Sequence, residues 1–175
     1  MKIYIDTGTL RVRSMIETDI AAMHAAIRAQ GWEKPADLYA RYWQWEQNGT
    51  RRIVVAELDG QVAGYLTLKP QADHGPFASR GVPEIEDLLV FEAFQRKGIG
   101  NRLMDAAEAL AAETAQEICL GVGLHSGYGS AQRMYAKRGY VPDGSGIWYN
   151  NKPLVPYAPC MNDDELVLYL SKVLQ

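Results

Sequence analysis

A short glycine-containing turn precedes a predicted helix in the middle of the chain. It comprises Gln95–Gly100, with the sequence Gln-Arg-Lys-Gly-Ile-Gly, and follows the apolar run Ile85–Phe91. Glycines let backbone N–H groups converge on an anion, and the unpaired N–H groups at a helix N-terminus add partial positive charge. Arg96 and Lys97 add mobile cations. The pattern predicts a pyrophosphate cradle, although a tight turn with solvated basic residues has the same composition.

A second segment strengthens this prediction. The turn alone lacks the third glycine of the dinucleotide fingerprint, and no Gly-Lys-Ser or Gly-Lys-Thr follows for a nucleoside triphosphate. Further along, Ala131, Tyr135 and Gly139 are spaced by four residues on a predicted short helix. A predicted strand, Glu117–Val122, separates the two segments.

The two segments together resemble the GCN5-related N-acetyltransferase (GNAT) superfamily. Gln95–Gly100 resembles its Gln/Arg-x-x-Gly-x-Gly/Ala signature, and Ala131–Tyr140 is similar to its C-terminal motif. The order of predicted elements extends the resemblance from about Leu10 to Tyr140. It implies an α/β fold with a mixed sheet of about seven strands, a splayed central parallel pair and four helices. We therefore expect an N-acetyltransferase that moves the acetyl group of acetyl-CoA directly to a primary amine.

The resemblance also implies where acetyl-CoA binds. The pantetheine arm would pair with strand backbone, as an amide-containing arm can when edge groups are unpaired. The pyrophosphate would lie on the glycine-containing turn, and Arg102, with Arg133 and Lys137, is a candidate for the nucleotide's phosphates. Tyr128 stands where the family often has asparagine. The predicted cofactor-binding residues are Leu88, Leu89, Val90, Gln95, Arg96, Lys97, Gly98, Ile99, Gly100, Arg102 and Tyr128.

Acetyl transfer needs a neutral amine, whereas alkyl amines are mostly protonated at neutral pH, so a proton must be removed by a base or through water. Glu86 is the first candidate base, because strand alternation turns it to the same face as Leu88. Glu84 shares that face and is the second candidate, whereas Asp87 is on the opposite face. Tyr135 matches the family's conserved tyrosine, and the resemblance implies that it protonates the CoA sulfur. Many relatives use water chains in place of a fixed base.

Other functions are compatible with parts of the sequence. A non-catalytic acyl-CoA-binding or sensor module would carry the same motifs. Gly121, Gly123 and Gly127 follow a predicted strand, and Asp143 lies 20 residues after Gly123, as in nicotinamide oxidoreductases. Only 32 residues follow Asp143, too few for the rest of a doubly wound domain. The two spaced motifs disfavour a purely structural protein.

Composition limits the remaining choices. The chain has 175 residues, 47% apolar and 22% charged, with a net charge of −3 at pH 7. These values are typical of one globular domain over residues 1–175 and exclude disordered and disulfide-scaffold classes. Without a basic field, a signal-peptide pattern or a long apolar run, we expect a cytoplasmic protein that binds neither nucleic acid nor membrane.

Cysteine and histidine spacing argues against a metal and against a covalent acetyl-enzyme. Neither Cys119 nor Cys160 is placed for nucleophilic work, and His24, His74 and His125 lack the spacing of metal ligands. A small-molecule amine is the favoured acceptor, because no extended docking surface is visible in the sequence. A homodimer is left open.

The elements that position these residues follow from apolar spacing. Helices are predicted from Thr18 to near Gly31, from Leu38 to near Gly49, from Ile99 to about Thr114, and over Ser130–Arg138. Strands are predicted at Leu10–Arg13, Arg52–Leu58, Val62–Leu68, Ile85–Phe91, Glu117–Val122, Ile147–Tyr149 and Leu166–Leu170. Asp59-Gly60 predicts a tight hairpin between the second and third of these strands.

The first two helices and the loop Gln71–Pro83 are expected to form the acceptor entrance. Five aromatic residues crowd the helices, and helical spacing assigns most of them to the core and one or two to a substrate wall. They are Trp32, Tyr39, Tyr42, Trp43 and Trp45. Asp73, Glu84 and Glu86 are the carboxylates expected to attract a cationic amine. The role of the tail Gly144–Gln175 is left open.

Overall fold

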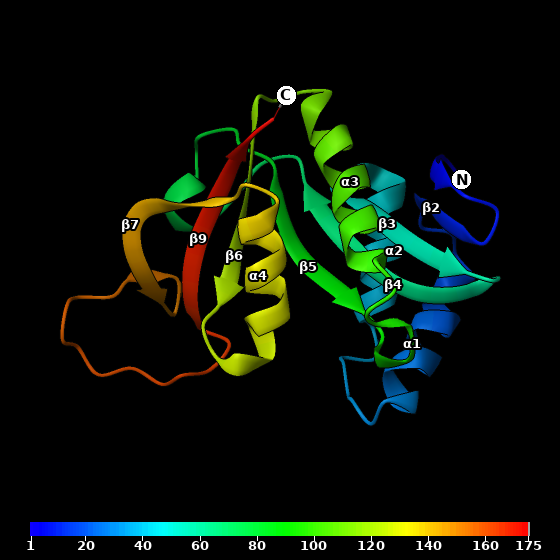
Figure 1. The fold of residues 1–175 in the computed structure, drawn as a ribbon, viewed down its shortest axis with the longest axis horizontal. Coiled ribbons are helices and arrows are strands. Elements are labelled where there is room, and N and C mark those ends of the chain that lie inside the picture. The colour runs from blue at the N-terminus through cyan, green and yellow to red at the C-terminus, as the bar shows by residue number, and fades with distance from the viewer. Residues whose placement is uncertain (175) are drawn as a thin grey trace. The chain divides into compact units, whose positions relative to one another are not determined.

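The computed structural model describes residues 1–174 (Figure 1). Its elements are β1 (Ile3–Asp6), β2 (Leu10–Ser14), α1 (Asp19–Ala29), α2 (Leu38–Asn48), β3 (Arg52–Leu58), β4 (Gln61–Lys69), η1 (Gly75–Phe77), β5 (Glu84–Val90), η2 (Glu92–Phe94), α3 (Ile99–Ala112), β6 (Glu117–Gly123), η3 (Ser126–Tyr128), α4 (Gly129–Lys137), β7 (Val141–Tyr149), β8 (Lys152–Pro153) and β9 (Leu166–Val173). They form two compact units. The first comprises Met1–Lys69 and Glu86–Leu110, and the second comprises Pro70–Ile85 and the described residues from Ala111 onward.

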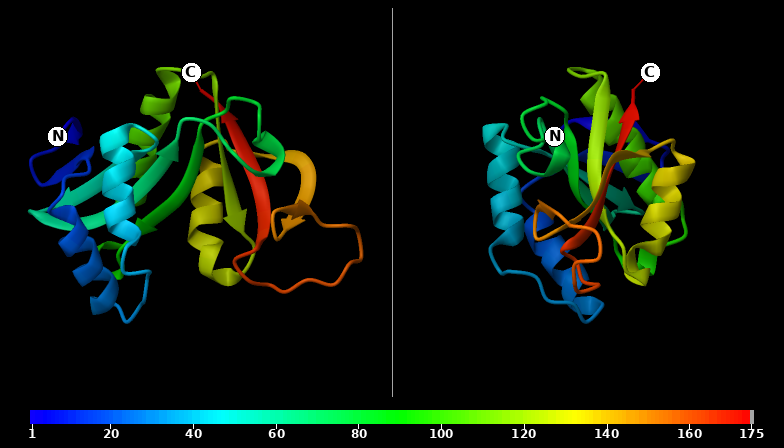
Figure 2. Two further views of the ribbon diagram at one scale, coloured as in Figure 1. Left: turned by 180° about the vertical axis from the view of Figure 1, so that it is seen from behind. Right: turned by 90° about the vertical axis from the view of Figure 1, so that its left-hand side faces the viewer.

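The first unit is built on antiparallel strands. β1 pairs with β2, β2 with β3, and β3 with β4, and β4 neighbours β5. Helices α1 and α2 cover one face of these strands and α3 covers the other (Figures 1 and 2). Asp59 and Gly60 have φ angles of 49° and 77°, the left-handed values that a two-residue hairpin of this type requires, so the predicted hairpin is confirmed.

The core of the first unit is rich in aromatic rings. Its buried residues are Met15, Met23, Ile27, Tyr39, Tyr42, Ile53, Val55, Tyr65 and Phe91. Gly64 allows β5 to approach β4, because a Cβ at that position would lie 2.6 Å from the carbonyl oxygen of Leu89. Burial of these rings removes apolar surface from water and fixes the face of β5 that meets α1 and α2.

A buried ion pair fixes the start of α1. Two guanidinium nitrogens of Arg13 on β2 lie 2.7 and 2.9 Å from the Asp19 carboxylate, and Asp19 also accepts the N–H of Ile16. Arg13 additionally donates to Glu57 at 3.0 Å. The Asp19 carboxylate raises the pKa of Arg13 further, so both partners carry opposite charges in the interior.

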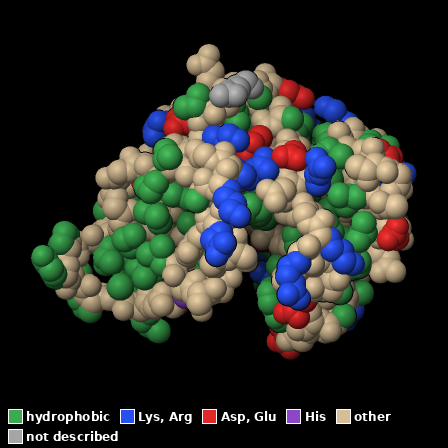
Figure 3. Space-filling view, viewed as in Figure 1, with side chains coloured by type: hydrophobic (Ala, Val, Ile, Leu, Met, Phe, Trp, Pro, Cys, Tyr) green, Lys and Arg blue, Asp and Glu red, His purple; other side chains and the backbone are tan. Residues whose placement is uncertain are grey.

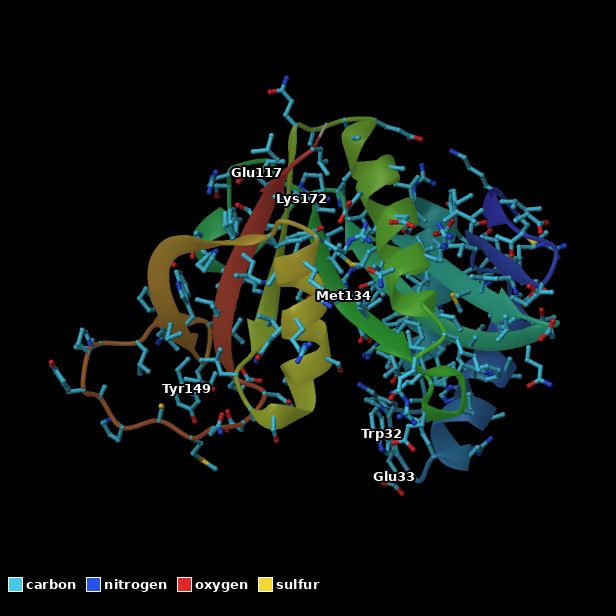
Figure 4. All side chains as sticks on the ribbon, viewed as in Figure 1. Trp32, Glu33, Glu117, Met134, Tyr149 and Lys172 are labelled. Atoms are coloured by element: carbon cyan, nitrogen blue, oxygen red, sulfur yellow. The ribbon has the colours of Figure 1, made fainter. Side chains whose placement is uncertain are left out.

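The second unit combines parallel and antiparallel pairing. The first residues of β5 pair in parallel with β6, through Glu84 with Cys119 and Ile85 with Leu120. β6 pairs antiparallel with β9, β9 with β7, and β7 with β8. The segment 154–165 between β8 and β9 forms a long loop (orange in Figure 1), and Tyr149 lies beside it at the end of β7 (Figure 4).

The predicted α/β class is confirmed, with a mixed sheet and four α-helices in residues 1–174, whereas the expected strand number is wrong. The described residues form nine strands, and β1 and β8 are the two that were not predicted. β8 has only two residues and includes Pro153, so it carries no alternation signal. The last helix-to-strand segment also differs, because β7 begins at Val141 and tolerates Gly144 and Gly146 within a register shift. None of the described helices is long and apolar enough to cross a membrane.

Candidate active site

The C-terminal half of β5 leads directly into the glycine-containing turn. Leu88, Leu89 and Val90 are half-buried, and Leu89 packs against the aromatic core of the first unit. The side-chain amide of Gln95 donates to the carbonyl oxygen of Val90 at 3.1 Å. The turn is therefore fastened to the end of the strand that carries the predicted pantetheine-binding backbone.

The turn itself has an unusual backbone. The N–H of Phe94 donates to Phe91, and that of Gln95 donates to Glu92, which forms the single turn η2. Arg96 and Gly98 then adopt left-handed φ angles of 62° and 79°. The N–H of Arg102 donates to the carbonyl oxygen of Gly98 at 3.3 Å, the first hydrogen bond of α3. The backbone N–H groups of the helix that precede Arg102 have no intrahelical acceptor.

The surface beside Gly98 is open. A Cβ at this position would meet no atom within 4 Å, so an approaching anion would encounter backbone rather than a side chain. Arg96 and Lys97 are exposed, and the Lys97 ammonium lies 5.5 Å from the centre of the Phe94 ring. Basic side chains gather over this part of the surface (Figure 3). The charge, the helix N-terminus and the open backbone fit a pyrophosphate.

Arg102 and Gln95 are already engaged in the protein. Arg102 pairs with Asp105 at 3.4 Å on the exposed side of α3, a contact that contributes little to stability. Gln95 holds the turn rather than extending freely toward a ligand. Gln95 is therefore placed to shape the cradle, and the exposed Arg102 is placed to supply charge.

Glu86 projects from β5 into an ion-pair cluster. Its carboxylate pairs with the Arg51 guanidinium and, at 2.8 Å, with the Lys69 ammonium. The guanidinium carbon (Cζ) of Arg51 also lies over the Trp45 ring, 4.1 Å from the ring centre. Two cations thus occupy hydrogen-bonding positions of the carboxylate that the sequence favours as general base, and that role stays a prediction.

The next residue, Asp87, lies on the opposite face, as the alternation predicts. Its Oδ2 accepts hydrogen bonds from the hydroxyls of Tyr42 at 2.7 Å and Tyr65 at 3.1 Å. Burial, reinforced by the negative charge of Asp87, raises the pKa of Tyr42 and of Tyr65 far above the usual tyrosine value. Both hydroxyls are therefore neutral donors. Alternation along the strand predicts the face on which Asp87 lies, but it cannot predict these hydrogen-bond partners, because Tyr42 is 45 residues away.

The aromatic residues near the expected acceptor entrance mostly belong to the core. Tyr39 and Tyr42 are buried, and Trp43 and Trp45 pack against the core cluster. Trp32 differs because 43% of its surface is exposed, and it lies in the segment between α1 and α2 (Figure 4). The expectation that most of the five belong to the core is confirmed, and the substrate wall stays a prediction.

In the second unit, Tyr135 lies on α4. It is 6% exposed, and its ring packs against Tyr140 with 5.8 Å between ring centres. The side chain of Gln132, on the same helix, donates to the carbonyl of Gly123 at 2.8 Å and ties α4 to the end of β6. The helix predicted from the spacing of four is therefore present, with its tyrosine buried.

The glycine-rich run in β6 and η3 is explained by packing. A Cβ on Gly121 would lie 2.9 Å from Val167, and one on Gly123 would overlap the ring of Tyr128. The Tyr128 hydroxyl donates to Asp164 at 2.9 Å, and His125 contacts the same carboxylate at 3.0 Å. The glycines therefore make room for aromatic rings, which removes the main reason for a nicotinamide site.

The structure contains one histidine cluster that the spacing of residues in the sequence does not indicate. His74 Nδ1 lies 2.5 Å from Asp73 Oδ1, and its Nε2 lies 3.8 Å from Glu84 Oε1. One potential ligand atom from each residue lies within 4.8 Å of the others. Glu84 is buried in the second unit, and His74 lies beside it. The role of Glu84 as an alternative base stays a prediction.

The predicted site residues divide between the units. The first unit carries Glu86 and ten of the eleven predicted cofactor-binding residues, from Leu88 to Arg102. Tyr128 and Tyr135 belong to the second unit.

Comparison with known proteins defines the class. A model of the Acetyltransferase (GNAT) family matches residues 19–140, so the chain belongs to this family. Both motifs and all four α-helices lie within the matched residues.

The individual relatives match this chain either over part of its length or at low sequence identity. GCN5-related N-acetyltransferase 4, chloroplastic, of Arabidopsis thaliana is 36% identical over 98 residues, 49% of this chain and 33% of that protein. The chain thus spans about a third of that relative's length. YncA of Salmonella typhimurium, solved with acetyl-CoA, superposes with a TM-score of 0.69 at 17% identity, covering 96% of this chain and 95% of that one. Ribosomal-protein-alanine N-acetyltransferase of Brucella melitensis gives 0.68 at 18% identity, covering 93% and 99%. These structures share the fold.

Proposed function

We propose that the protein is an N-acetyltransferase that uses acetyl-CoA to acetylate a primary amine directly. The observation that carries this proposal is the turn Gln95–Gly100, whose left-handed Arg96 and Gly98 expose backbone N–H groups at the start of α3. The membership of the chain in the GNAT family supports it. The solved relative that holds acetyl-CoA supports the choice of donor.

The turn and β5 supply binding and orientation. The N–H groups at the start of α3, with Arg96 and Lys97, bind the pyrophosphate, and Arg102 adds charge. The backbone of Leu88–Val90 pairs with the pantetheine arm. Acetyl-CoA supplies an activated thioester, so the chain needs no nucleophile of its own, and neither Cys119 nor Cys160 takes part.

The reaction then requires two proton movements. The amine nitrogen forms a bond with the acetyl carbon, the carbon–sulfur bond breaks, and the nitrogen of the ammonium loses two protons and keeps one as the amide N–H. Glu86 or a water chain accepts the proton of the incoming ammonium. Tyr135 donates its hydroxyl proton to the departing sulfur, a role assigned from the family resemblance, and the second proton lost by the nitrogen restores its hydroxyl. The net products are an amide, free CoA thiol and one proton.

The acceptor is proposed to be a small molecule, with a protein N-terminus as the second candidate. The structural similarity to a ribosomal-protein-alanine N-acetyltransferase favours including the second. A non-catalytic acyl-CoA-binding module is the alternative to both.

A thiol-release assay with a panel of primary amines tests the proposal. The panel comprises amino acids, polyamines, aminoglycosides and short peptides with a free α-amine, each with acetyl-CoA. Amine-dependent release of CoA thiol, with the acetylated product identified by mass spectrometry, is the expected result. Saturable binding of acetyl-CoA without release for any amine would instead favour the binding module.

A further inference from the structure

Two neighbouring carboxylates on β5 differ in their charge partners. Glu86 pairs with Arg51 and Lys69, whereas Asp87, among residues 1–174, accepts only from the neutral hydroxyls of Tyr42 and Tyr65. In the described part of the chain, Asp87 forms no ion pair, and both tyrosine bonds end on Oδ2. Its Oδ1 is therefore available to a ligand.

A half-buried carboxylate that has no cationic partner carries an unbalanced negative charge. Neutral hydrogen bonds stabilise the carboxylate but leave its negative charge in place. A buried or partly buried charge is favoured when an opposite charge joins it. Arg51 and Lys69 pair with Glu86, the residue before Asp87, and Arg51 is further held over the Trp45 ring.

The surroundings of Asp87 are suited to an organic cation. Tyr42 and Tyr65 pack edge to face with ring centres 5.9 Å apart, and Tyr42 stacks on Trp45 at 5.5 Å. Aromatic rings attract ammonium groups through their negative faces and give apolar contact to an alkyl chain. Asp87 and Trp45 are half-buried and can be reached from solvent, whereas the rings of Tyr42 and Tyr65 are buried behind them.

The position of Asp87 along β5 is next to the proposed acetyl-CoA-binding backbone. It directly precedes Leu88, the first residue of the backbone proposed to hold the pantetheine arm. A ligand at Oδ1 would therefore lie next to the segment on which the thioester is oriented.

We propose that Asp87 binds the acceptor in its ammonium form, with Tyr42 and Tyr65 as positioning residues that fix the carboxylate. The chemical class of acceptor is a primary alkylammonium, whether on a small molecule or at a peptide N-terminus. The inference rests on the proposed acetyl-transfer function. The bound ammonium then passes its proton to the base or to water before transfer.

Kinetics of the full-length Asp87→Asn variant test this inference. The amine probes are spermidine and a tetrapeptide with a free α-amine, which distinguish the two sources. We expect Asp87→Asn to raise the KM for the accepted amine at least about tenfold, with the Kd for acetyl-CoA changed less than about twofold. Asp37→Asn, an exposed carboxylate paired with Arg41, is the matched control and should change neither value. An unchanged amine KM in Asp87→Asn would overturn the inference.

The tyrosines have a milder expected effect. Tyr42→Phe and Tyr65→Phe should each raise the amine KM roughly two- to tenfold, because each removes one neutral hydrogen bond. Asp87→Glu should restore part of the amine affinity lost in Asp87→Asn. Propyltrimethylammonium, which cannot be acetylated, should compete with the amine in the parent and not in Asp87→Asn. Loss of affinity without loss of this competition would indicate a merely structural role and contradict the inference.

A binding arm separates failure of the inference from failure of the proposed function. If the parent binds no acetyl-CoA and acetylates no amine, the function fails, and calorimetric titration with spermidine and with the tetrapeptide then decides the inference. Saturable binding that is lost in Asp87→Asn supports the ammonium site. Binding that is absent, or equal in both proteins, overturns it. Equal thermal unfolding temperatures for the parent and the variant exclude misfolding as the cause.

Discussion

The side-chain amide of Gln95 donates a hydrogen bond to the carbonyl oxygen of Val90, at 3.1 Å. This bond closes the segment between β5 and α3, so that the end of the strand and the start of the helix are held together. A pyrophosphate cradle needs such support, because its binding groups are backbone N–H groups on a short turn.

Gln95→Ala should loosen the turn without unfolding the protein. Loss of one hydrogen bond predicts a Kd for acetyl-CoA that rises roughly two- to tenfold. Calorimetric titration measures the change, and Gln71→Ala, at an exposed position in the second unit, is the control. Equal affinity in Gln95→Ala and the parent would show that the bond does not shape the cradle.

Gly98→Val should abolish detectable binding of acetyl-CoA. A β-branched side chain disfavours the φ angle of 79° and projects into the open surface where the anion is expected. Gly8→Val provides the same backbone strain, at φ 91° and with equally open surroundings, but lies between β1 and β2. A folded Gly98→Val protein that binds acetyl-CoA like Gly8→Val would disprove the cradle.

Tyr135→Phe should lower kcat by about 10²-fold or more while the Kd for acetyl-CoA stays the same, because a general acid acts on the reaction and not on binding. Tyr140→Phe, which changes the neighbouring ring in the same contact, is the control. Stopped assays of CoA thiol release measure kcat. Comparable turnover in both variants would exclude Tyr135 as the acid.

Removing the buried partner of Arg13 should strongly destabilise the fold. Asp19→Ala removes the bidentate partner of the buried Arg13 guanidinium and leaves it the partly exposed Glu57. We expect a loss of about 3 kcal/mol in the free energy of unfolding, the lower end of the range for a broken buried ion pair. Asp37→Ala, in an exposed pair at a helix start, should lose less than about 1 kcal/mol. Urea denaturation gives both values, and similar losses would mean that Arg13 is solvated.

Alkaline pH should destabilise the protein through its buried tyrosines. Burial raises the pKa of Tyr39 from 10.0 to about 12, so the folded state binds a proton that the unfolded state releases between these values. Stability is therefore constant below the unfolded pKa and falls as pH rises from 10 toward 12. Tyr39→Phe should flatten this decline in urea titrations at several pH values, and a parallel curve would contradict the assignment.

The sequence contains the local features of this fold and few of its long-range contacts. The hairpin at Asp59-Gly60, the turn at Gln95–Gly100 and the helix that carries Tyr135 follow from turn chemistry and apolar spacing, and all are present. β1 was missed because only four residues, IYID, form it.

Site contacts were harder to predict for a physical reason. Alternation on β5 correctly separates Glu86 from Asp87, but it cannot reveal that Arg51, 35 residues away, pairs with Glu86. Nor can the run containing Gly121 and Gly123 show that aromatic rings fill the space above it. Such contacts depend on the packing of elements distant in sequence.

The most direct test of the central claim is calorimetric titration of the purified protein with acetyl-CoA, with NADH titrated in parallel. The account predicts saturable binding of acetyl-CoA and none of NADH. Binding of NADH alone, or of neither ligand when an amine acceptor is also present, would contradict the assignment of Gln95–Gly100 as an acetyl-CoA cradle.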